Sequence, residues 1–539
     1  MAKQIFYGDT AREKVLAGAK ALSDAVKTTM GPKGRNVVIG KTYGGPSVTH
    51  DGVTVAEAID LPETDEYLGE KIGAELIKQA AKKMNKVAGD GTTTVTVLTY
   101  EILREANRLI AAGHNPMELR KGVEKAAHTI LDKLSKIAEP VKGNQDLIAE
   151  VASISAGDTE IGQLIADVMA KIGRDGVVSV EAGQGMNLES EVVEGFTFDR
   201  GYISSYMVTD ANRMEAAYDK PAIIITDKKV SSAQEFLPLI EKVASAGKKD
   251  IVLIAEDVTG EALGVLILNK YKGVLNTLAI KAPSFSERRK DALQDIATLT
   301  GATVISADHG MTFDNVGLEV VGSARRVIST KDSTTIIEGA GDKNQIAERI
   351  KLIAAQKATA QSDYDKEQIA KRAASLSGKV AVIKVGGATE TEIEEKKYRV
   401  DDAVAAVKAA LDGGIVPGGG VTLVNLANEI TSDDAGADIL RHALLAPFKQ
   451  ITANAGLNSE ALLAQVQAAK PGYGVNVMDY NNKLIDLKQA GVVDPARVTH
   501  EAIKNAVSIA STAMTMGALV VDLPKPETQN PVGNGMGMM

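Results

Sequence analysis

The stretch Ala-Gly-Asp-Gly-Thr-Thr-Thr at residues 88–94 stands directly before a helix-forming run, Val-Thr-Val-Leu at 95–98. Two glycines flank one aspartate, and three hydroxyl side chains follow. At a helix start, free backbone N–H groups and the positive end of the dipole favour anions. Asp90 would repel a bare phosphate unless it holds a Mg²⁺ ion that bridges the phosphate oxygens. The stretch therefore predicts a phosphate-binding loop, with plain helix capping as the alternative.

Two further loops carry residues of the same kind. Thr-Met-Gly-Pro-Lys-Gly at 29–34 ends an N-terminal helix, and its small residues would let a ligand approach the backbone. His-Asp-Gly at 50–52 places a second carboxylate in a turn. Taken singly, each loop also fits ordinary turn chemistry. The chain has no G-x-x-x-x-G-K-[ST] motif, and no G-x-G-x-x-G follows a strand. The sequence therefore predicts neither a P-loop nor a Rossmann dinucleotide site.

A third carboxylate lies far along the chain, in a helical pattern at 400–411. Asp402 falls opposite the apolar stripe, on a face lined by alanines. The stripe consists of Val400, Val404, Val407 and Leu411, and the alanines are Ala405, Ala406 and Ala409. Such a carboxylate can orient or deprotonate an attacking water, although a solvated aspartate near a helix start is an equally plain interpretation. The preceding residues 390–399 predict a solvated helix with Glu392/Lys396 and Glu395/Arg399 ion pairs.

Helical patterns fill the chain to about residue 137 and return after residue 400. Between about 175 and 385 the pattern changes to short β-branched runs separated by helical segments, which predicts an α/β region. These runs are 222–226, 251–255, 303–306 and 380–385. Because the three carboxylates fall in the two helical arms, we expect the arms to form one domain with the α/β region inserted. The Gly/Met-rich end, 531–539, predicts disorder.

The composition excludes several classes of function. The 539 residues contain no cysteine, which removes disulfide frameworks, thiolate zinc sites and Cys nucleophiles. Six histidines without close pairing argue against a His-built metal site. With 61 basic against 70 acidic residues, the net charge of −9 argues against nucleic acid as a partner. No signal peptide and no apolar run of about 18 residues is apparent, so we expect no membrane partner and a cytoplasmic location.

A series of stretches resembles the group I chaperonins of the GroEL type, and the resemblance runs from about residue 3 to the tail. The stretches are 29–36, 51–53, 88–94, 198–202, 281–283, 295–301, 331–337 and the Gly/Met tail.

That resemblance implies a chaperonin fold, which is multidomain α/β. An α-helical equatorial ATPase domain would comprise residues 1–136 and 413–527, and a small α/β intermediate hinge domain residues 137–193 and 381–412. An α/β apical domain would span 194–380, followed by a disordered tail at 528–539. The family assembles as two stacked seven-subunit rings, which implies a homo-oligomer.

The resemblance also implies a binding site for ATP, Mg²⁺ and K⁺. Asp90 would bind Mg²⁺, and Asp402 would polarise the hydrolytic water with Asp51 near the same γ-phosphate. The ATP-binding residues would be Thr29, Met30, Gly31, Pro32, His50, Asp90, Gly91, Thr92, Thr93, Thr94, Ile154, Gly419, Asn476, Val477, Met478 and Asp494.

Two expected apical helices, 232–243 and 261–269, carry more apolar residues than one buried stripe requires. By resemblance, an exposed surface there would capture non-native polypeptides or a small co-chaperonin of the GroES type. Its residues would be Tyr202, Tyr206, Met207, Leu237, Ile240, Leu263, Ile267 and Leu268. For each of them, core packing is the alternative.

Two positions depart from the family pattern. His50 stands where the family has a lysine beside the phosphates, and a neutral imidazole supplies less positive charge. Gly195 matches the first hinge glycine, whereas Lys379 occupies the position expected for the second.

Together these features predict an ATP-driven folding chaperonin. The competing hypotheses are a holdase or scaffold ring with weakened hydrolysis, and an unrelated monomeric ATPase or kinase without a P-loop.

Overall fold

The computed structural model describes residues 3–523, except 41–45, 63, 65–66, 142, 174–175, 184, 211–212, 285–286, 360–368, 370–371, 374, 377 and 480–482. The expected disordered tail lies outside the described residues. The chain forms two compact units: residues 1–170, 182–188 and 385–539 make the first, and residues 171–181 and 189–384 the second. The first unit thus contains most of both chain arms. The finer division into three domains stays a prediction.

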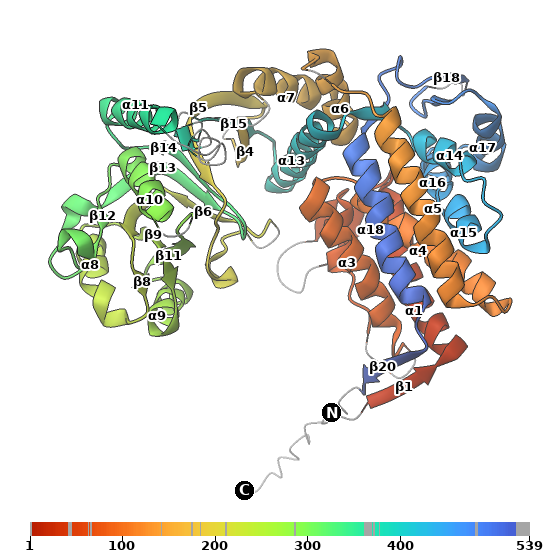
Figure 1. The fold of residues 1–539 in the computed structure, drawn as a ribbon, viewed down its shortest axis with the longest axis horizontal. Helices are drawn as coiled ribbons and strands as arrows, with labels where there is room; N and C mark the ends of the chain where they lie inside the picture. Colours follow the sequence, from red (N-terminus) through yellow and green to blue (C-terminus); the bar gives the residue numbers. More distant parts are fainter. Residues whose placement is uncertain are drawn as a thin grey trace, which may run out of the picture. The chain divides into compact units, whose positions relative to one another are not determined.

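Helices dominate the first unit, where α3, α4, α5 and α18 run side by side (Figure 1). The helices are α1 (Gly8–Val26), α2 (Gly52–Ala58), α3 (Glu70–Ala88), α4 (Thr92–Ala111), α5 (Pro116–Ile137), α6 (Gln145–Ala156), α7 (Thr159–Ile172, which reaches into the second unit), α13 (Glu390–Gly413), α14 (Val421–Asn428), α15 (Ala435–Ala443), α16 (Ala446–Asn454), α17 (Ser459–Ala468) and α18 (Ala496–Met514).

Small residues let α1 and α3 pack with their backbones almost in contact. A Cβ at Gly18 would lie 1.7 Å from the carbonyl oxygen of Glu70, and one at Gly73 would lie 1.9 Å from that of Val15. The expected cap of α5 is confirmed, because the Asn115 side chain accepts a 2.8 Å hydrogen bond from the Met117 N–H. These local features fix the helical frame that carries the loops between helices.

Short antiparallel strand pairs complete the first unit. β1 (Lys3–Tyr7) pairs with β20 (Ala518–Asp522), and β2 (Val37–Ile39) pairs with β3 (Ser47–Thr49). β16 (Ile415–Pro417) pairs with β19 (Val493–Pro495), and β17 (Tyr473–Val475) pairs with β18 (Leu484–Asp486). The β1–β20 pair joins the two ends of the described chain.

The second unit is built on a ten-stranded mixed sheet with the order β11-β9-β7-β13-β14-β5-β15-β4; β12 also pairs with β7 and β6 with β13. The strands are β4 (Val177–Ala182), β5 (Glu189–Phe198), β6 (Ala216–Asp219), β7 (Ala222–Thr226), β9 (Asp250–Ala255), β11 (Asn276–Lys281), β12 (Val304–Ile305), β13 (Gly322–Ser329), β14 (Thr334–Gly339) and β15 (Lys379–Val385). β8 (Lys229–Val230) and β10 (Asp257–Val258) form a separate parallel pair. The α/β region is confirmed.

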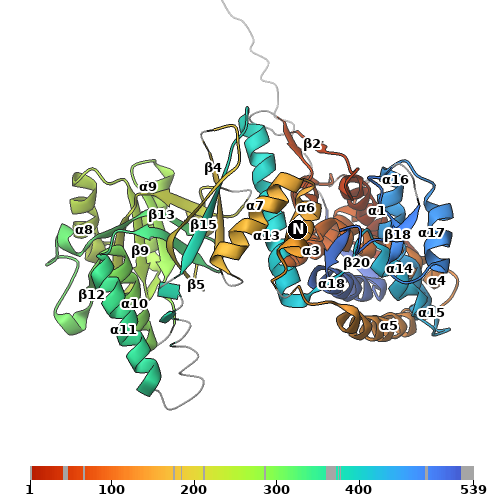
Figure 2. The same ribbon diagram turned by 90° about the horizontal axis from the view of Figure 1, so that it is seen from above.

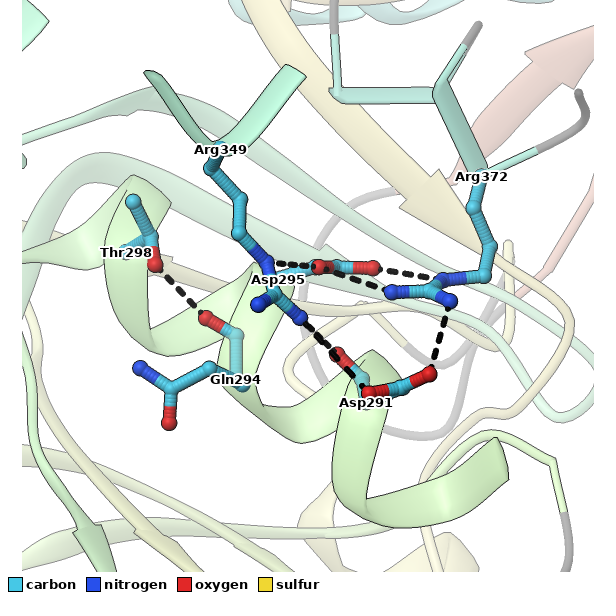
Figure 3. Close-up of polar contacts among 6 residues, drawn as sticks. All are labelled: Asp291, Gln294, Asp295, Thr298, Arg349 and Arg372. Atoms are coloured by element: carbon cyan, nitrogen blue, oxygen red, sulfur yellow. Dashed lines mark hydrogen bonds and ion pairs between the residues drawn. The ribbon is translucent and has the colours of Figure 1, made fainter. Parts of the chain in front are cut away.

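Helices of the described residues accompany this sheet, among them α8 (Ala233–Ser245), α9 (Gly260–Tyr271), α10 (Glu287–Thr300) and α11 (Lys343–Thr359). Figure 2 shows α10 and α11 next to each other. An ion cluster joins them, in which the buried Asp295 of α10 accepts hydrogen bonds from Arg349 at 2.7 Å and Arg372 at 2.8 Å (Figure 3). Arg372 also bonds Asp291 at 3.0 Å. Two guanidinium groups thus balance one carboxylate that has no access to water.

We expected Lys379 to replace the second hinge glycine, but the register of β5 and β15 shows a glycine at the neighbouring position. Lys379 lies opposite Glu194, so Gly195 lies next to Gly378, and the Gly195 N–H donates to the Gly378 carbonyl at 3.1 Å. The second glycine is therefore present, one residue before Lys379. A Cβ at Gly195 would lie 2.2 Å from a Val380 methyl, which explains the need for glycine there.

None of the helices in the described ranges combines the length and the hydropathy needed to cross a bilayer.

Candidate functional site

The Gly-Asp-Gly turn between α3 and α4 has the backbone geometry of an anion-binding helix start. Gly89 ends α3 and Gly91 begins α4, both in the left-handed region at φ +71° and +80°. The first helical bond of α4 runs from the Val95 N–H to the Gly91 carbonyl, at 3.0 Å. The N–H groups of residues 92–94 therefore precede the helical ladder and can serve a ligand.

The loop after α1 lies against this helix start. The hydroxyl of Thr29 lies 3.3 Å from that of Thr93. The amide of Asn454 donates to the carbonyls of Lys27 and Met30, at 3.0 and 2.9 Å, and so fixes the loop. The structure therefore brings Thr29, the first of the expected residues 29–32, to Thr93, one of the expected threonines. Asn454 has a supporting role that the sequence did not reveal, because it comes from the opposite chain arm.

The third loop contributes Asp51, which caps the N-terminus of α2. Its carboxylate accepts from the N–H groups of Val53 at 3.1 Å and Thr54 at 2.8 Å, and from the Thr54 hydroxyl at 2.5 Å. A Cβ at Gly52 would lie 2.4 Å from the Thr93 hydroxyl oxygen, so this turn touches the start of α4. Asp51 therefore caps a helix, as ordinary turn chemistry would have it, and its turn also lies beside the start of α4.

Asp402 lies on a helix that packs against the Gly-Asp-Gly turn. A Cβ at Gly89 would lie 2.3 Å from that of Ala405, so α13 packs directly on the Gly-Asp-Gly turn, with Asp402 about one helical turn before the contact. Burial raises the pKa of Asp402 well above its ordinary value, and the charges of Asp51 and Asp90, with that of the adjacent aspartate, raise it further. Two carboxylates of the N-terminal arm, Asp51 and Asp90, thus act on a carboxylate of the opposite arm.

The interpretation of Asp402 as a residue near a helix start is wrong, and its side chain is only partly exposed to solvent. α13 begins at Glu390, so Asp402 lies in its middle, and Ala406 and Ala409 are buried as well as the valine stripe. The expected ion-paired segment forms the first part of the same helix: Lys396 pairs with Glu392 at 2.7 Å and Arg399 with Glu395 at 2.5 Å.

The charge on Asp90 is only partly compensated. Burial raises its pKa and the charge of Asp51 adds to this, whereas hydrogen bonds from the Gly91 N–H at 2.5 Å and the Ser155 hydroxyl at 3.4 Å lower it. Within the described ranges, no group of three or more acidic or histidine side chains is placed to hold a metal by itself. The donor set therefore fits a hard dication that takes its other oxygens from phosphate and water.

His50 does not replace the positive charge of a lysine. Burial lowers its pKa first, and the nearby Arg399 lowers it further, while Glu395, Asp51 and a backbone hydrogen bond with Thr29 act in the opposite direction. Because the net shift is downward, the imidazole is neutral at pH 7. Arg399, which the sequence assigned only to an ion pair with Glu395, is a cation near His50.

Asp494 reaches this site from β19. A Cβ at Gly418 would lie 2.9 Å from its carboxylate oxygen. Burial, followed by the charge of Asp90, raises the pKa of Asp494 to about 7. Ile154, which precedes the Asp90 partner Ser155 on α6, is exposed.

The remaining expected nucleoside contacts lie on the loop after β17. The Asn476 side chain accepts a 3.0 Å hydrogen bond from the Met478 N–H, Val477 is buried and Met478 is exposed. This loop is linked to Gly419 through Leu487, which lies behind both Gly419 and Gly474. Among the described residues, no hydrogen bond or ion pair joins Asn476, Val477 or Met478 to the carboxylates.

In the second unit, the expected capture residues do not form one exposed set. Tyr206 and Leu268 are exposed, whereas Tyr202, Met207 and Ile240 are buried. Leu237, Leu263 and Ile267 lie at the edge of the core. The buried members have core partners: Tyr202 bridges to β11, and Met207 packs against the same strand. Tyr271 and Val274, at the end of α9 and just after it, are exposed apolar residues that the sequence reasoning missed.

The family comparison agrees with these features. Residues 22–524 match the model of the TCP-1/cpn60 chaperonin family. This match spans nearly the whole chain, including both arms that contribute carboxylates and the inserted α/β unit between them. It supports a chaperone function, the binding of substrate polypeptides and assembly into rings, and known members are ATPases. The chain belongs to the TCP-1/cpn60 chaperonin family.

Proposed function

We propose that this protein is an ATP-driven chaperonin subunit of the group I type. It captures non-native polypeptides and encloses them in a ring cavity under a small co-chaperonin lid, in the cytoplasm. The observation that carries the ATPase part is the meeting of Asp51, Asp90 and Asp402 beside the start of α4, where the pKa values of Asp90 and Asp402 are raised. Carboxylates with raised pKa values next to an anion-binding helix start are typical of a phosphoryl-transfer site.

Each group has a distinct role in this proposal. The N–H groups and hydroxyls of residues 92–94 bind phosphate oxygens, and Asp90 holds Mg²⁺, with K⁺ as a second cation. The bound Mg²⁺ would neutralise phosphate charge. Asp402 accepts a proton from the attacking water, and its raised pKa makes it a stronger base than a solvated aspartate. Asp51 orders the α2 turn beside Thr93 and orients that water.

The experiment is a steady-state ATPase assay with nucleotide binding measured on the same variants. Asp402→Asn removes the base but keeps the shape of the side chain, so we expect turnover to fall by about 10²–10⁴ with binding retained. Asp401→Asn is the matched control, because it removes the adjacent carboxylate of the same helix. Turnover that survives Asp402→Asn as well as it survives Asp401→Asn would show that Asp402 is not the base.

A holdase with weak hydrolysis is the second candidate, and the neutral His50 favours it, because the site then lacks one cation beside the phosphates. Refolding of a stringent substrate with ATP and the co-chaperonin separates the two functions. If aggregation is suppressed but refolding fails, the holdase is correct.

Native mass tests the assembly. About fourteen chains would match two stacked rings, about seven a single ring, and one chain the unrelated monomeric enzyme.

A further inference from the structure

The segment that carries the exposed Tyr206 is fixed through its backbone by Lys270, in the last turn of α9. The Lys270 ammonium donates to the carbonyl of Met207 and, at 2.9 Å, to that of Val208. It also lies 5.6 Å from the ring centroid of Tyr218, whose hydroxyl is 3.3 Å from the same Met207 carbonyl. Side chains from α9 and β6 therefore hold one short turn.

The two neighbours in this turn point in opposite directions. Met207 is fully buried, and its sulfur accepts a 3.1 Å hydrogen bond from the Ala279 N–H, whereas Tyr206 is 76% exposed. Residues Ser205–Met207 form a single 3₁₀ turn, which has little helical stability of its own. The exposure of Tyr206 therefore depends on what holds the backbone on its C-terminal side.

The charge of Lys270 is costly in this place. Burial lowers its pKa to about 8, and no acidic neighbour contributes to the shift. Lysines that only cover apolar surface direct the ammonium to water, and an apolar residue would fill the same space without desolvating a charge. Two charge-assisted hydrogen bonds and a cation–π contact offset the cost. The ammonium donates hydrogen bonds to the two carbonyls, which a packed methyl group could not do.

We propose that Lys270 is a positioning residue for polypeptide capture. Its ammonium fixes the Met207–Val208 backbone, so that Tyr206 is presented to solvent near the C-terminal turn of α9, which exposes Leu268 and Tyr271. The partner is an unfolded chain that offers apolar and aromatic side chains to these residues. The capture role rests on the proposed function, whereas the positioning concerns this unit alone.

The chain contains no tryptophan, so Tyr206→Trp gives a single fluorescent reporter on the turn itself. In that background we would compare Lys270→Met, Lys270→Gln and Lys270→Arg. Lys272→Met is the matched control, because it removes the same charge from an exposed residue just after α9. Time-resolved anisotropy reports the nanosecond freedom of the turn, and binding of reduced, alkylated lactalbumin reports capture. Circular dichroism checks that each variant is folded.

We expect Lys270→Met to increase the mobility of the reporter and to weaken capture by about 3-fold or more, with Lys270→Gln intermediate. Lys270→Arg and Lys272→Met should match the background. If Lys270→Met unfolds the unit, Lys270→Gln is compared with Lys270→Arg instead. Higher mobility and weaker capture in Lys270→Gln than in Lys270→Arg then support the inference.

Two results would overturn the inference. Unchanged anisotropy without the ammonium would show that Lys270 does not hold the turn, and increased mobility with unchanged capture would remove its role in capture. If the background protein binds no unfolded chain, the proposed function fails, and the positioning is then decided by anisotropy alone.

Discussion

Replacement of Asp494 by asparagine should make the stability of the nucleotide-free protein less sensitive to pH. The folded protein raises the pKa of this carboxyl from 3.8 to about 7, mainly through burial and then through the charge of Asp90. Between these values the folded protein holds a proton that the unfolded chain has released. The stability contributed by Asp494 is therefore fully present below about pH 4 and is lost as the pH rises through about 7.

The size of this effect follows from the shift. Each pKa unit corresponds to about 1.4 kcal/mol, so a shift of about three units sets a ceiling of about 4 kcal/mol above pH 7. Because Asp494 keeps partial contact with solvent, we expect about 1–3 kcal/mol, or a melting temperature about 2–5 °C higher for Asp494→Asn at pH 8.

The assay is differential scanning calorimetry without nucleotide or Mg²⁺, at about pH 5 and about pH 8, with protein concentration and scan rate fixed because assembly affects melting. Other titrating groups affect both proteins alike, so the difference between wild type and variant isolates Asp494. Asp433→Asn, at an exposed loop position, is the control and should follow the wild type. If the melting temperatures of Asp494→Asn and of the wild type change by the same amount between the two pH values, Asp494 does not contribute to the pH dependence as expected.

Three further predictions concern other parts of the structure. Gly52→Ala would place a Cβ 2.4 Å from the Thr93 hydroxyl oxygen, so ATP affinity measured by calorimetric titration should fall, although alanine favours helices. An affinity equal to that of the wild type would show that this contact does not matter for ATP binding. Asp295→Asn leaves two arginines without their buried counter-charge and should lower the free energy of unfolding in urea by about 3–5 kcal/mol, and a loss below about 1 kcal/mol would refute this. His50→Lys adds a cation near Asp51 and should strengthen ATP binding severalfold at low salt; affinity that is unchanged at every salt concentration would show that charge at this position is irrelevant.

Local sequence patterns predicted the elements that depend on local forces. The β-branched runs became β7, β9 and β15 with nearly the expected bounds, because a continuous apolar run suits a buried strand. The ion-paired segment before residue 400 became helix because oppositely charged side chains four residues apart face each other on one. The N-terminal helix was expected to end at the stretch 29–34, but α1 ends at Val26, and a 3₁₀ turn at Lys27–Thr29 leads into the loop.

The exposed and buried faces were harder to predict. The alanine-lined side of α13 looked open from the sequence, but Ala405 packs on Gly89. The capture residues looked like one surface, but Met207 is buried in the core against a strand far along the chain, whose Ala279 N–H donates to its sulfur. Burial on a second side depends on elements distant in sequence, and a periodic pattern carries no information about them.

The sequence by itself determined the kinds of chemistry available: carboxylates in glycine-rich turns, threonines at a helix start, no thiols and no tryptophan. Only the tertiary structure decided which of these groups meet. Asp90 and Asp402 come from opposite chain arms, and their pKa values rise because folding removes much of their contact with water. The charge of Asp51 acts on Asp90, and the charges of Asp51 and Asp90 act on Asp402. The tertiary structure likewise decided that Lys270 holds the turn of Tyr206, because desolvation and backbone hydrogen bonding depend on which surfaces come together.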